Sequence, residues 1–479
     1  MGESLQPNFI AGEWVSSADA VDVLDPAIDE VIARVSLVGS KELDRAINAA
    51  EQVHRSGALT RVRPSIRRDM LWRVGDALAF LKPSGAILLS RESGKRLIDA
   101  EAEFDEAIAY FRYYSGLADK IEGSSIPLGA EYHDYTVRIP YGVTAHIVPW
   151  NFPLAITARS LAPALAAGNT AVVKLSELAP LTGLLLGKAC EIAAIPKGAV
   201  SILCGDGATI GNALVQHDAI QQVVFTGSVR VGQQILERLA QRVVPAVTEL
   251  GGKSAAIVAP DADLDQVRQN VYSGAFLNAG QVCSAMSRLI VPRALQDQLS
   301  AMIAQDISKL SIGPGIKNND VTPVISQQHA DRILTAVADA KDEGATLVAG
   351  GHRLNRIGNF VAPTLFKDVT RDMTLAQNEV FGPVLAILPY DSLQEALAIA
   401  NCTKFGLAAG IFTRSLNLAH SLASQLEAGQ IYVNEWYAGG IETPFGGMKL
   451  SGNGRDKGQD AILNYLQTKN IGIRLNDLE

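Results

Sequence analysis

The chain has 479 residues, of which 48% are hydrophobic and 19% charged, which is typical of a large folded protein with about three domains or two large domains and an appendage. Its formal net charge is −8 and no basic run stands out, so neither a nucleic acid nor a membrane surface is expected as a partner. No stretch of 18 uninterrupted apolar residues occurs, which predicts no membrane-spanning segment.

Helical periodicity dominates the first part of the chain. Apolar residues recur at intervals of three and four within 41–56, 65–90 and 95–120, which predicts amphipathic helices, one or two of them in the second range. Segment 131–143 instead alternates polar with β-branched or aromatic residues. This pattern predicts an exposed strand or hairpin arm.

From residue 143 onward, apolar strands alternate with helices. The predicted strands are 144–148, 170–175, 199–204 and 222–226, and the predicted helices are 153–167 and 180–194. After Gly251–Gly252 a second series of strands follows at 255–259, 288–291, 346–349, 409–412 and 430–433. Buried strands separated by helices indicate parallel sheets, so we expect two doubly wound α/β domains that meet near residue 250.

The four cysteines, at 190, 204, 283 and 402, form no C-x-x-C pair, and no histidines fall at ligand spacing. No metal site is therefore expected. So few thiols fit a reducing compartment, and the first 20 residues contain acids but neither Lys nor Arg, unlike a secretory or transit peptide. A cytoplasmic location is the expectation.

Two of the predicted strands end in residues suited to a dinucleotide. The strand 222–226 runs into Gly227-Ser228 and then a helix that includes Gly232, which would present free N–H groups to a pyrophosphate, although the full G-x-G-x-x-G pattern is absent. Lys174 and Glu177 end another strand, where they could contact ribose hydroxyls, and the Glu177 carboxylate would repel a 2′-phosphate, favouring NAD over NADP. An ordinary strand–helix turn and a solvated pair of surface charges are the alternatives.

Three further residues have side chains suited to covalent catalysis. Asn151, within Pro149-Trp-Asn-Phe-Pro153, could donate to an oxyanion or simply cap a turn. Cys283 follows a glycine between a helix and a strand, where a thiol could be reactive, although free cysteines are more often inert core residues. Glu249 stands beside the Gly251–Gly252 pair and is a candidate general base.

Taken together, these segments resemble the aldehyde dehydrogenase superfamily over nearly the whole chain. Seven motifs stand in the order and spacing of that family: PWNFP (149–153), KLSE (174–177), FTGS (225–228), ELGGKS (249–254), GQVC (280–283), EVFGP (379–383) and PFGGMKLSGNGRD (444–456). The resemblance implies an α/β fold of the aldehyde dehydrogenase type, with two doubly wound domains and a small β arm. It implies a dinucleotide-binding domain of residues 1–118 and 141–250, a catalytic domain of 251–463, and an oligomerisation element of 119–140 and 464–479 that joins a homodimer or homotetramer.

The resemblance also implies a role for each site residue. Cys283 would attack the aldehyde to form a thiohemiacetal, with the oxyanion held by Asn151, and hydride transfer to NAD would leave a thioester. Glu249 would activate the water that hydrolyses it. Cofactor contacts are implied for Trp150, Lys174, Glu177, Gly227, Ser228, Gly232, Glu379 and Phe381.

The resemblance also implies which residues face the substrate. By the resemblance, Phe152, Ile156 and Arg159 share a helix face that turns toward the substrate tunnel, and Trp436 and Tyr437 would wall it. Arg159 is similar to the residue of enzymes that oxidise semialdehydes with a distal anion, and of some that oxidise aromatic aldehydes. The second arginine of a carboxylate clamp is replaced by Leu277, and an ion pair of Arg159 with Glu106 is the structural alternative.

Two other functions stay open. Transfer of the acyl group to coenzyme A is disfavoured by Glu249, because acylating relatives generally lack this glutamate. A catalytically silent structural protein on the same fold could lose Cys283, Asn151 or Glu249, and this chain retains all three. The one departure from the motifs is Asp456, where many relatives have Glu, and this segment is expected to be structural.

Overall fold

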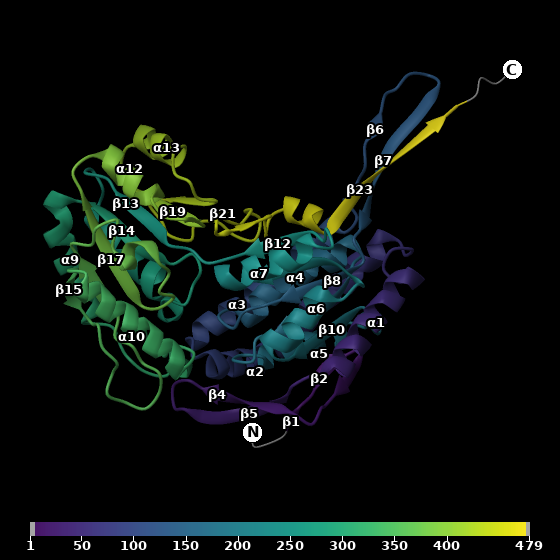
Figure 1. Ribbon diagram of the computed structural model, residues 1–479, viewed down its shortest axis with the longest axis horizontal. Helices are drawn as coiled ribbons and strands as arrows, with labels where there is room; N and C mark the ends of the chain where they lie inside the picture. Colours follow the sequence, from purple (N-terminus) through teal and green to yellow (C-terminus); the bar gives the residue numbers. More distant parts are fainter. Residues whose placement is uncertain (1–4, 476–479) are drawn as a thin grey trace.

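The computed structural model describes residues 5–475 and consists of two α/β lobes with a β arm that projects from one of them (Figure 1). The first lobe is built on an eight-stranded sheet of order β22-β12-β11-β8-β9-β10-β2-β3. Its strands are β2 (Asn8–Ile10), β3 (Glu13–Val15), β8 (Val143–Ile147), β9 (Thr170–Leu175), β10 (Val200–Cys204), β11 (Ile220–Thr226), β12 (Ala246–Glu249) and β22 (Gly452–Asn453). The five strands from β12 to β10 are mutually parallel.

Helices cover both faces of this sheet, because successive strand residues point to opposite sides. Ala171, Val173 and Leu175 of β9 face one core, and Val172 faces the other. The first core is closed by α2 (Pro64–Ser93), α3 (Leu97–Leu117), α4 (Pro153–Ala167) and α5 (Leu181–Ile192), and the second by α1 (Ser40–Ser56), α6 (Asn212–Gln216) and α7 (Val229–Ala240).

The second lobe repeats this plan on a seven-stranded sheet of order β15-β16-β17-β14-β13-β19-β20. Its strands are β13 (Ser254–Val258), β14 (Met286–Pro292), β15 (Thr346–Ala349), β16 (Thr364–Lys367), β17 (Val384–Tyr390), β19 (Ala408–Phe412) and β20 (Gln430–Val433), parallel except for β15. One face packs on α8 (Leu264–Val271) and α9 (Arg293–Ile307), the other on α10 (Gln327–Asp342), α11 (Thr374–Gln377), α12 (Leu393–Asn401) and α13 (Leu416–Ala423).

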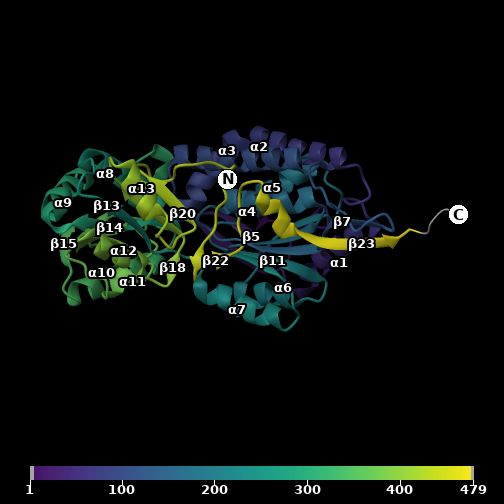
Figure 2. The ribbon, with the colours of Figure 1, turned by 90° about the horizontal axis from the view of Figure 1, so that it is seen from above.

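The arm is a three-stranded antiparallel sheet that stands away from both lobes (Figures 1 and 2). β7 (Tyr132–Pro140) pairs along its whole length with β23 (Leu466–Arg474) and at its far end with β6 (Ser125–Ile126). Segments 119–140 and 464–475 of the predicted oligomerisation element thus lie side by side. Residues 1–4 of the predicted dinucleotide-binding domain and residues 476–479 of the oligomerisation element lie outside the described residues. None of the helices in residues 5–475 is both long and apolar enough to span a bilayer.

The predicted helices and most predicted strands are confirmed to within a few residues, and α4, β9, β15 and β20 have the predicted bounds. The range 65–90 forms one helix, α2, with Pro83 inside it. Other strands were not predicted: the N-terminal β1 (Leu5–Gln6), β4 (Ala20–Asp25) and β5 (Glu30–Ser36) with β2 and β3, and also β12, β16 and β17. Most are short, and a run of two to four residues carries little periodicity.

Two chain segments connect the two lobes. β12 ends at Glu249 and β13 begins at Ser254, so four residues span the distance between the sheets. Later, β22 adds antiparallel to β12, so that Gly452 pairs with Glu249. The end of the predicted catalytic segment therefore belongs structurally to the sheet of the first lobe, beside its last parallel strand.

Candidate active site

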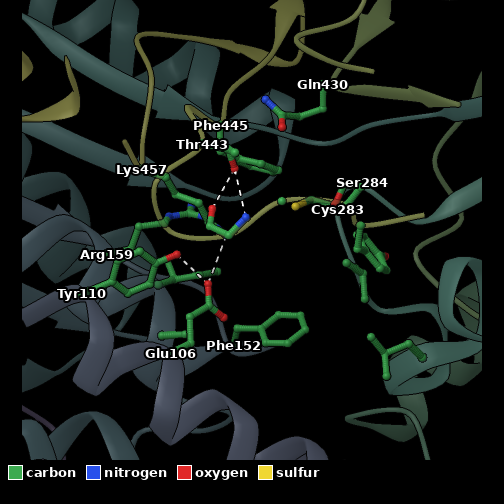
Figure 3. Close-up of a pocket in the computed structure, with 18 of the residues that line it drawn as sticks. Glu106, Tyr110, Phe152, Arg159, Cys283, Ser284, Gln430, Thr443, Phe445 and Lys457 are labelled. Atoms are coloured by element: carbon green, nitrogen blue, oxygen red, sulfur yellow. Dashed lines mark hydrogen bonds and ion pairs between the residues drawn. The ribbon is translucent and has the colours of Figure 1, made fainter. Parts of the chain in front are cut away.

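A cavity of about 330 Å³ is bounded by residues of both lobes. Its wall comes from α3, α4, the loop before β14, and the segments that follow β20 and β22. The main lining side chains are Glu106, Tyr110, Asn151, Phe152, Ile156, Arg159, Leu277, Cys283, Ser284, Gln430, Tyr432, Tyr437, Thr443, Phe445 and Lys457. Figure 3 shows Cys283 on one side of this space and the charged group of Glu106, Arg159 and Lys457 on the other.

The loop that carries Cys283 has an unusual backbone. The φ angles of Asn278, Ala279 and Gly280 are positive, at 51°, 54° and 70°. Residues other than glycine rarely adopt this left-handed backbone conformation, which persists only when the surrounding structure enforces it. On the other side of the loop, a Cβ on Gly252 would lie 2.5 Å from the Cys283 carbonyl oxygen. The loop is therefore held tightly, and it leaves the Cys283 side chain partly accessible from the cavity.

The surroundings of the Cys283 thiol disfavour its ionised form. Burial raises its pKa to about 11, while the positive charge of Arg159 acts in the opposite direction. The other three cysteines differ from it in location: Cys190 and Cys204 are buried in the core of the first lobe, and Cys402 is exposed. Cys283 is thus the one of the four thiols that lines the cavity.

Asn151 lies between β8 and α4 and reaches the cysteine loop. Its side-chain Nδ2 donates to the Gln281 carbonyl at 3.0 Å, two residues before Cys283. Its backbone carbonyl accepts from Lys95 Nζ at 2.9 Å and from Asn278 Nδ2 at 3.2 Å. The amide group is thereby held next to the thiol, in a position to donate to an oxygen atom in the cavity.

Glu249 is buried, 3% exposed, and neither of its carboxylate oxygens has a hydrogen-bond partner among residues 5–475. Burial and the negative charge of Asp456 raise its pKa well above the ordinary value, against the opposing charge of Arg159. Gly446 makes room for it, since a Cβ there would lie 2.8 Å from Glu249 Oε1. A carboxyl group without partners is free to bond a water molecule or a reacting proton.

Arg159 forms an ion pair, but with Asp456 rather than with Glu106. Its Nε lies 2.7 Å from Asp456 Oδ2, and both side chains are less than 10% exposed. Glu106 instead pairs with Lys457 at 3.2 Å and accepts a hydrogen bond from Tyr110. The alternative of a Glu106–Arg159 pair is therefore wrong, because segment 444–457 folds back and brings Lys457 to the cavity and Asp456 to Arg159 behind its wall.

The remaining residues expected near the substrate separate into two groups. Phe152, Ile156 and Tyr437 line the cavity, and Tyr437 has a positive φ of 68°. Trp436 lies behind the wall, where its Nε1 donates to the Ser284 carbonyl at 3.2 Å and its ring packs edge-on against Tyr432.

The residues expected to contact a dinucleotide gather at the carboxyl edge of the first sheet. Trp150 follows β8, Lys174 is the penultimate residue of β9, and Gly227 and Ser228 follow β11. Parallel strands present these ends at one edge, which is where open α/β sheets bind ligands. The buried Lys174 Nζ lies 3.1 Å from Glu177 Oε2.

Ser228 is the N-cap of α7, where its hydroxyl accepts from the Val231 N–H, and Gly227 donates its N–H to the Glu249 carbonyl at 3.0 Å. Gly232 lies in the first turn of this helix, where a Cβ would lie 2.6 Å from Leu250. The glycine thus lets the helix approach the strand end closely.

Glu379 and Phe381 reach the same region from the second lobe. Glu379 Oε1 accepts the Gly252 N–H at 3.1 Å, and burial raises its pKa to about 7. Phe381, with a φ of 56°, packs edge-on against Trp150, and its carbonyl accepts from His329 Nε2 at 2.7 Å. His329 also packs against Trp150, a contact that sequence reasoning missed because nothing around this residue on α10 distinguishes it from a surface histidine.

A double-mutant cycle tests the ion pair of Arg159 and Asp456. Asp456→Asn and Arg159→Met each leave one buried charge without its partner, so each is expected to cost about 3–5 kcal/mol of local stability and to lower Tm. The double variant Arg159→Met/Asp456→Asn has no unpaired charge and is expected to regain most of that loss. Additive losses in Tm, measured by thermal unfolding of the three variants, would contradict the pairing.

Known proteins are similar to this chain over nearly its whole length. The aldehyde dehydrogenase family model matches residues 14–471. An aldehyde dehydrogenase of Aspergillus niger is 38% identical over 473 residues (98% of this chain, 95% of that one), and the cytosolic aldehyde dehydrogenase 1 of Mus musculus is 38% identical over 477 residues (98% and 95%).

Two solved structures are similar throughout. The NAD+ complex of an aldehyde dehydrogenase from Bacillus cereus has a TM-score of 0.97 at 34% identity, covering 99% of this chain and 97% of its own. A betaine aldehyde dehydrogenase from Staphylococcus aureus in complex with NAD+ has a TM-score of 0.97 at 33% identity, covering 99% and 95%. The chain therefore belongs to the aldehyde dehydrogenase family of oxidoreductases.

Proposed function

We propose that this chain is a cytoplasmic enzyme that oxidises an aldehyde to the carboxylic acid with NAD, through a covalent intermediate on Cys283. The observation that carries the proposal is the convergence of an accessible thiol, an amide donor and a carboxyl group without hydrogen-bond partners, all provided by residues of the described chain 5–475. Four unpaired cysteines are in keeping with a reducing compartment.

In this reaction the Cys283 sulfur, after releasing its proton to solvent, attacks the carbonyl carbon and forms a thiohemiacetal. The Asn151 amide turns from the Gln281 carbonyl to the new oxyanion, whose charge it stabilises. NAD, when bound, would supply the hydride acceptor, and loss of the hydride from this carbon would leave a thioester on Cys283. Glu249 then removes a proton from the attacking water, and the acid departs as the sulfur is released.

The residues at the carboxyl edge of the first sheet fit a dinucleotide. Lys174 and Glu177 would hold the adenosine ribose, Gly227 and Ser228 at the start of α7 would face the pyrophosphate, and Glu379 would bond the nicotinamide ribose. The Bacillus cereus and Staphylococcus aureus relatives are NAD+ complexes. Because the Glu177 carboxylate adjoins Lys174, a 2′-phosphate is disfavoured and NADP is the less suitable cofactor.

NADH formation by the purified protein tests the reaction. Cys283→Ala is expected to abolish it, whereas Cys402→Ala, at an exposed thiol, is the matched control and retains it.

The Cys283 thiol and the Glu249 carboxyl must both be deprotonated and both have raised pKa values, so the rate is expected to rise with pH above neutrality and to fall below it.

Glu249→Gln separates the alternatives. We expect about one NADH per subunit in a first turnover and then a steady rate lowered by about 10²-fold or more, because hydrolysis lacks its base. Turnover of the wild type only when coenzyme A is supplied would indicate the acylating reaction. No NADH formation with any aldehyde would indicate the structural protein.

The cavity favours an aromatic aldehyde with a distal hydroxyl over a semialdehyde with a distal anion. The aromatic rings that line this cavity belong to Tyr110, Phe152, Tyr432, Tyr437 and Phe445. The charge of Arg159 is neutralised by Asp456 behind the wall, and that of Lys457 by Glu106. The distal carboxylate of a semialdehyde would be repelled by Glu106, whereas the distal hydroxyl of an aromatic aldehyde could donate to Glu106 and accept from Lys457.

This substrate assignment predicts a selective effect of Glu106→Gln and Lys457→Met. Each is expected to lower kcat/KM for 4-hydroxybenzaldehyde about 10-fold, since a hydrogen bond to a charged group is lost, and to change kcat/KM for benzaldehyde by less than about 2-fold. Succinate semialdehyde is expected to be the poorest of the three with the wild type and to improve with Glu106→Gln. If it is the best substrate of the wild type, the assignment is wrong.

We also propose that the arm of 119–140 and 464–475 joins subunits into a homodimer or homotetramer. Its outer strands β6 and β23 have unpaired edges, and Ile126, Leu128, Tyr132 and Ile473 expose apolar surface along it. Leu128→Lys with Ile473→Lys is expected to reduce the molar mass measured by light scattering. Ile357→Lys, at an apolar residue of the second lobe that is 74% exposed, is the control and should leave the mass unchanged.

A further inference from the structure

A buried ion pair outside the cavity contacts the residue that provides the oxyanion donor. Lys95 stands in the turn between α2 and α3, and Glu103 lies on α3. Lys95 Nζ bonds Glu103 Oε2, and the two side chains are 0% and 1% exposed. Burial of two charges is expensive, and an apolar pair of similar volume often gives equal or greater stability, so the pair calls for an explanation other than stability.

Lys95 directs its other contacts at one short segment. Besides Glu103, its ammonium group donates to the Asn151 carbonyl at 2.9 Å and lies 4.1 Å from the centre of the Phe152 ring. Both contacts belong to the turn between β8 and α4. The ammonium group thus has three partners, the Glu103 carboxylate, the Asn151 carbonyl and the Phe152 ring, which matches its three N–H groups.

Glu103 fixes the other end of the same turn. Its Oε1 accepts the backbone N–H groups of Leu154 at 2.9 Å and Ala155 at 3.1 Å, in the first turn of α4. These are N–H groups that a helix N-terminus leaves without intrahelical partners. The ion pair therefore clamps Asn151 from both sides, by its own carbonyl and by the helix that begins two residues later.

Glu92 provides an internal comparison. It is also a fully buried carboxyl group at a helix start, accepting from the Leu181 N–H and from the N–H and hydroxyl of Thr182 at α5. In the described part of the chain it forms no ion pair. Capping a helix in this core therefore needs no lysine, and what Lys95 adds at α4 is its bond to the Asn151 carbonyl.

We propose that Lys95 and Glu103 are positioning residues of the reaction, which act by holding Asn151 so that its amide faces the Cys283 loop. The inference rests on the proposed oxyanion role of Asn151. On the opposite side, Asn278 Nδ2 donates to the same Asn151 carbonyl, and the amide bonds Gln281. Catalysis through an oxyanion donor depends on its direction, so a loosened Asn151 slows formation of the covalent adduct while substrate and cofactor still bind.

A double-mutant cycle on the first turnover tests this. The rate of the NADH burst is measured under saturating NAD and benzaldehyde for wild type, Lys95→Met, Asn151→Ala and the double variant. Lys95→Met is expected to lower the burst rate about 10- to 100-fold with KM changed less than about 3-fold. In the Asn151→Ala background the same substitution should have no further effect, because the amide that Lys95 positions is gone.

Lys95→Met/Glu103→Gln removes both buried charges and is included so that the question can be answered if the single variant folds poorly. It is expected to have a lowered burst rate as well, since the neutral pair cannot hold the Asn151 carbonyl. Glu92→Gln is the matched control: it alters a buried carboxyl at the start of α5 and is expected to retain the wild-type burst rate.

Three results would overturn the inference. The first is a multiplicative loss in the double variant, which would mean that Lys95 acts independently of Asn151. The second is a wild-type burst rate in Lys95→Met/Glu103→Gln. The third is a wild-type burst rate in Asn151→Ala alone, which would remove the oxyanion role itself, and this outcome separates failure of the proposed function from failure of the clamp.

Discussion

The geometry of the active site depends on the short crossing between the two sheets at Gly251–Gly252. A Cβ on Gly251 would lie 2.2 Å from Glu379 Oε2, and one on Gly252 would lie 2.5 Å from the Cys283 carbonyl oxygen. The crossing follows Glu249, so the candidate base, the Cys283 loop and the Glu379 carboxyl group are all packed around four residues. Any side chain larger than the hydrogen atom of glycine would push these groups apart. The geometry of the site therefore requires glycine at both positions.

Charge is distributed unevenly around this crossing. Arg159–Asp456, Glu106–Lys457 and Lys95–Glu103 are matched pairs, and each fixes a segment of the cavity wall or of the turn that carries Asn151. Glu249 stands apart from them, with a raised pKa and without a hydrogen-bond partner in residues 5–475. A carboxyl group in this state is poorly stabilised as an anion, and that is the condition in which it binds a proton strongly during catalysis.

Much of the fold could be predicted from the sequence because long elements repeat their pattern many times. The apolar run of β9 and the helix of α4, bounded by Pro153 and Gly168, were predicted with the observed bounds. The four-residue strands β15 and β20 were predicted too, whereas β12 and β16, of the same length, and the seven-residue β17 were not, because a short apolar run cannot be told from a buried helix segment by periodicity alone. For the site, family motifs named Cys283 and its neighbours, whereas Lys95, Glu103 and His329 could not be found, since their roles arise from contacts across 50 or more residues of chain.

The segment 444–457 shows why a motif that looks structural can still shape the chemistry. Gly452, with a φ of 131°, lets β22 lie against Glu249, since a Cβ there would be 2.0 Å from the Thr248 carbonyl oxygen. The same turn places Asp456 where its charge holds Arg159 and also raises the pKa of Glu249. One carboxylate thus links the substrate wall on α4 to the candidate base on β12. A change at Asp456 is therefore expected to alter the position of Arg159 and the pKa of Glu249 together.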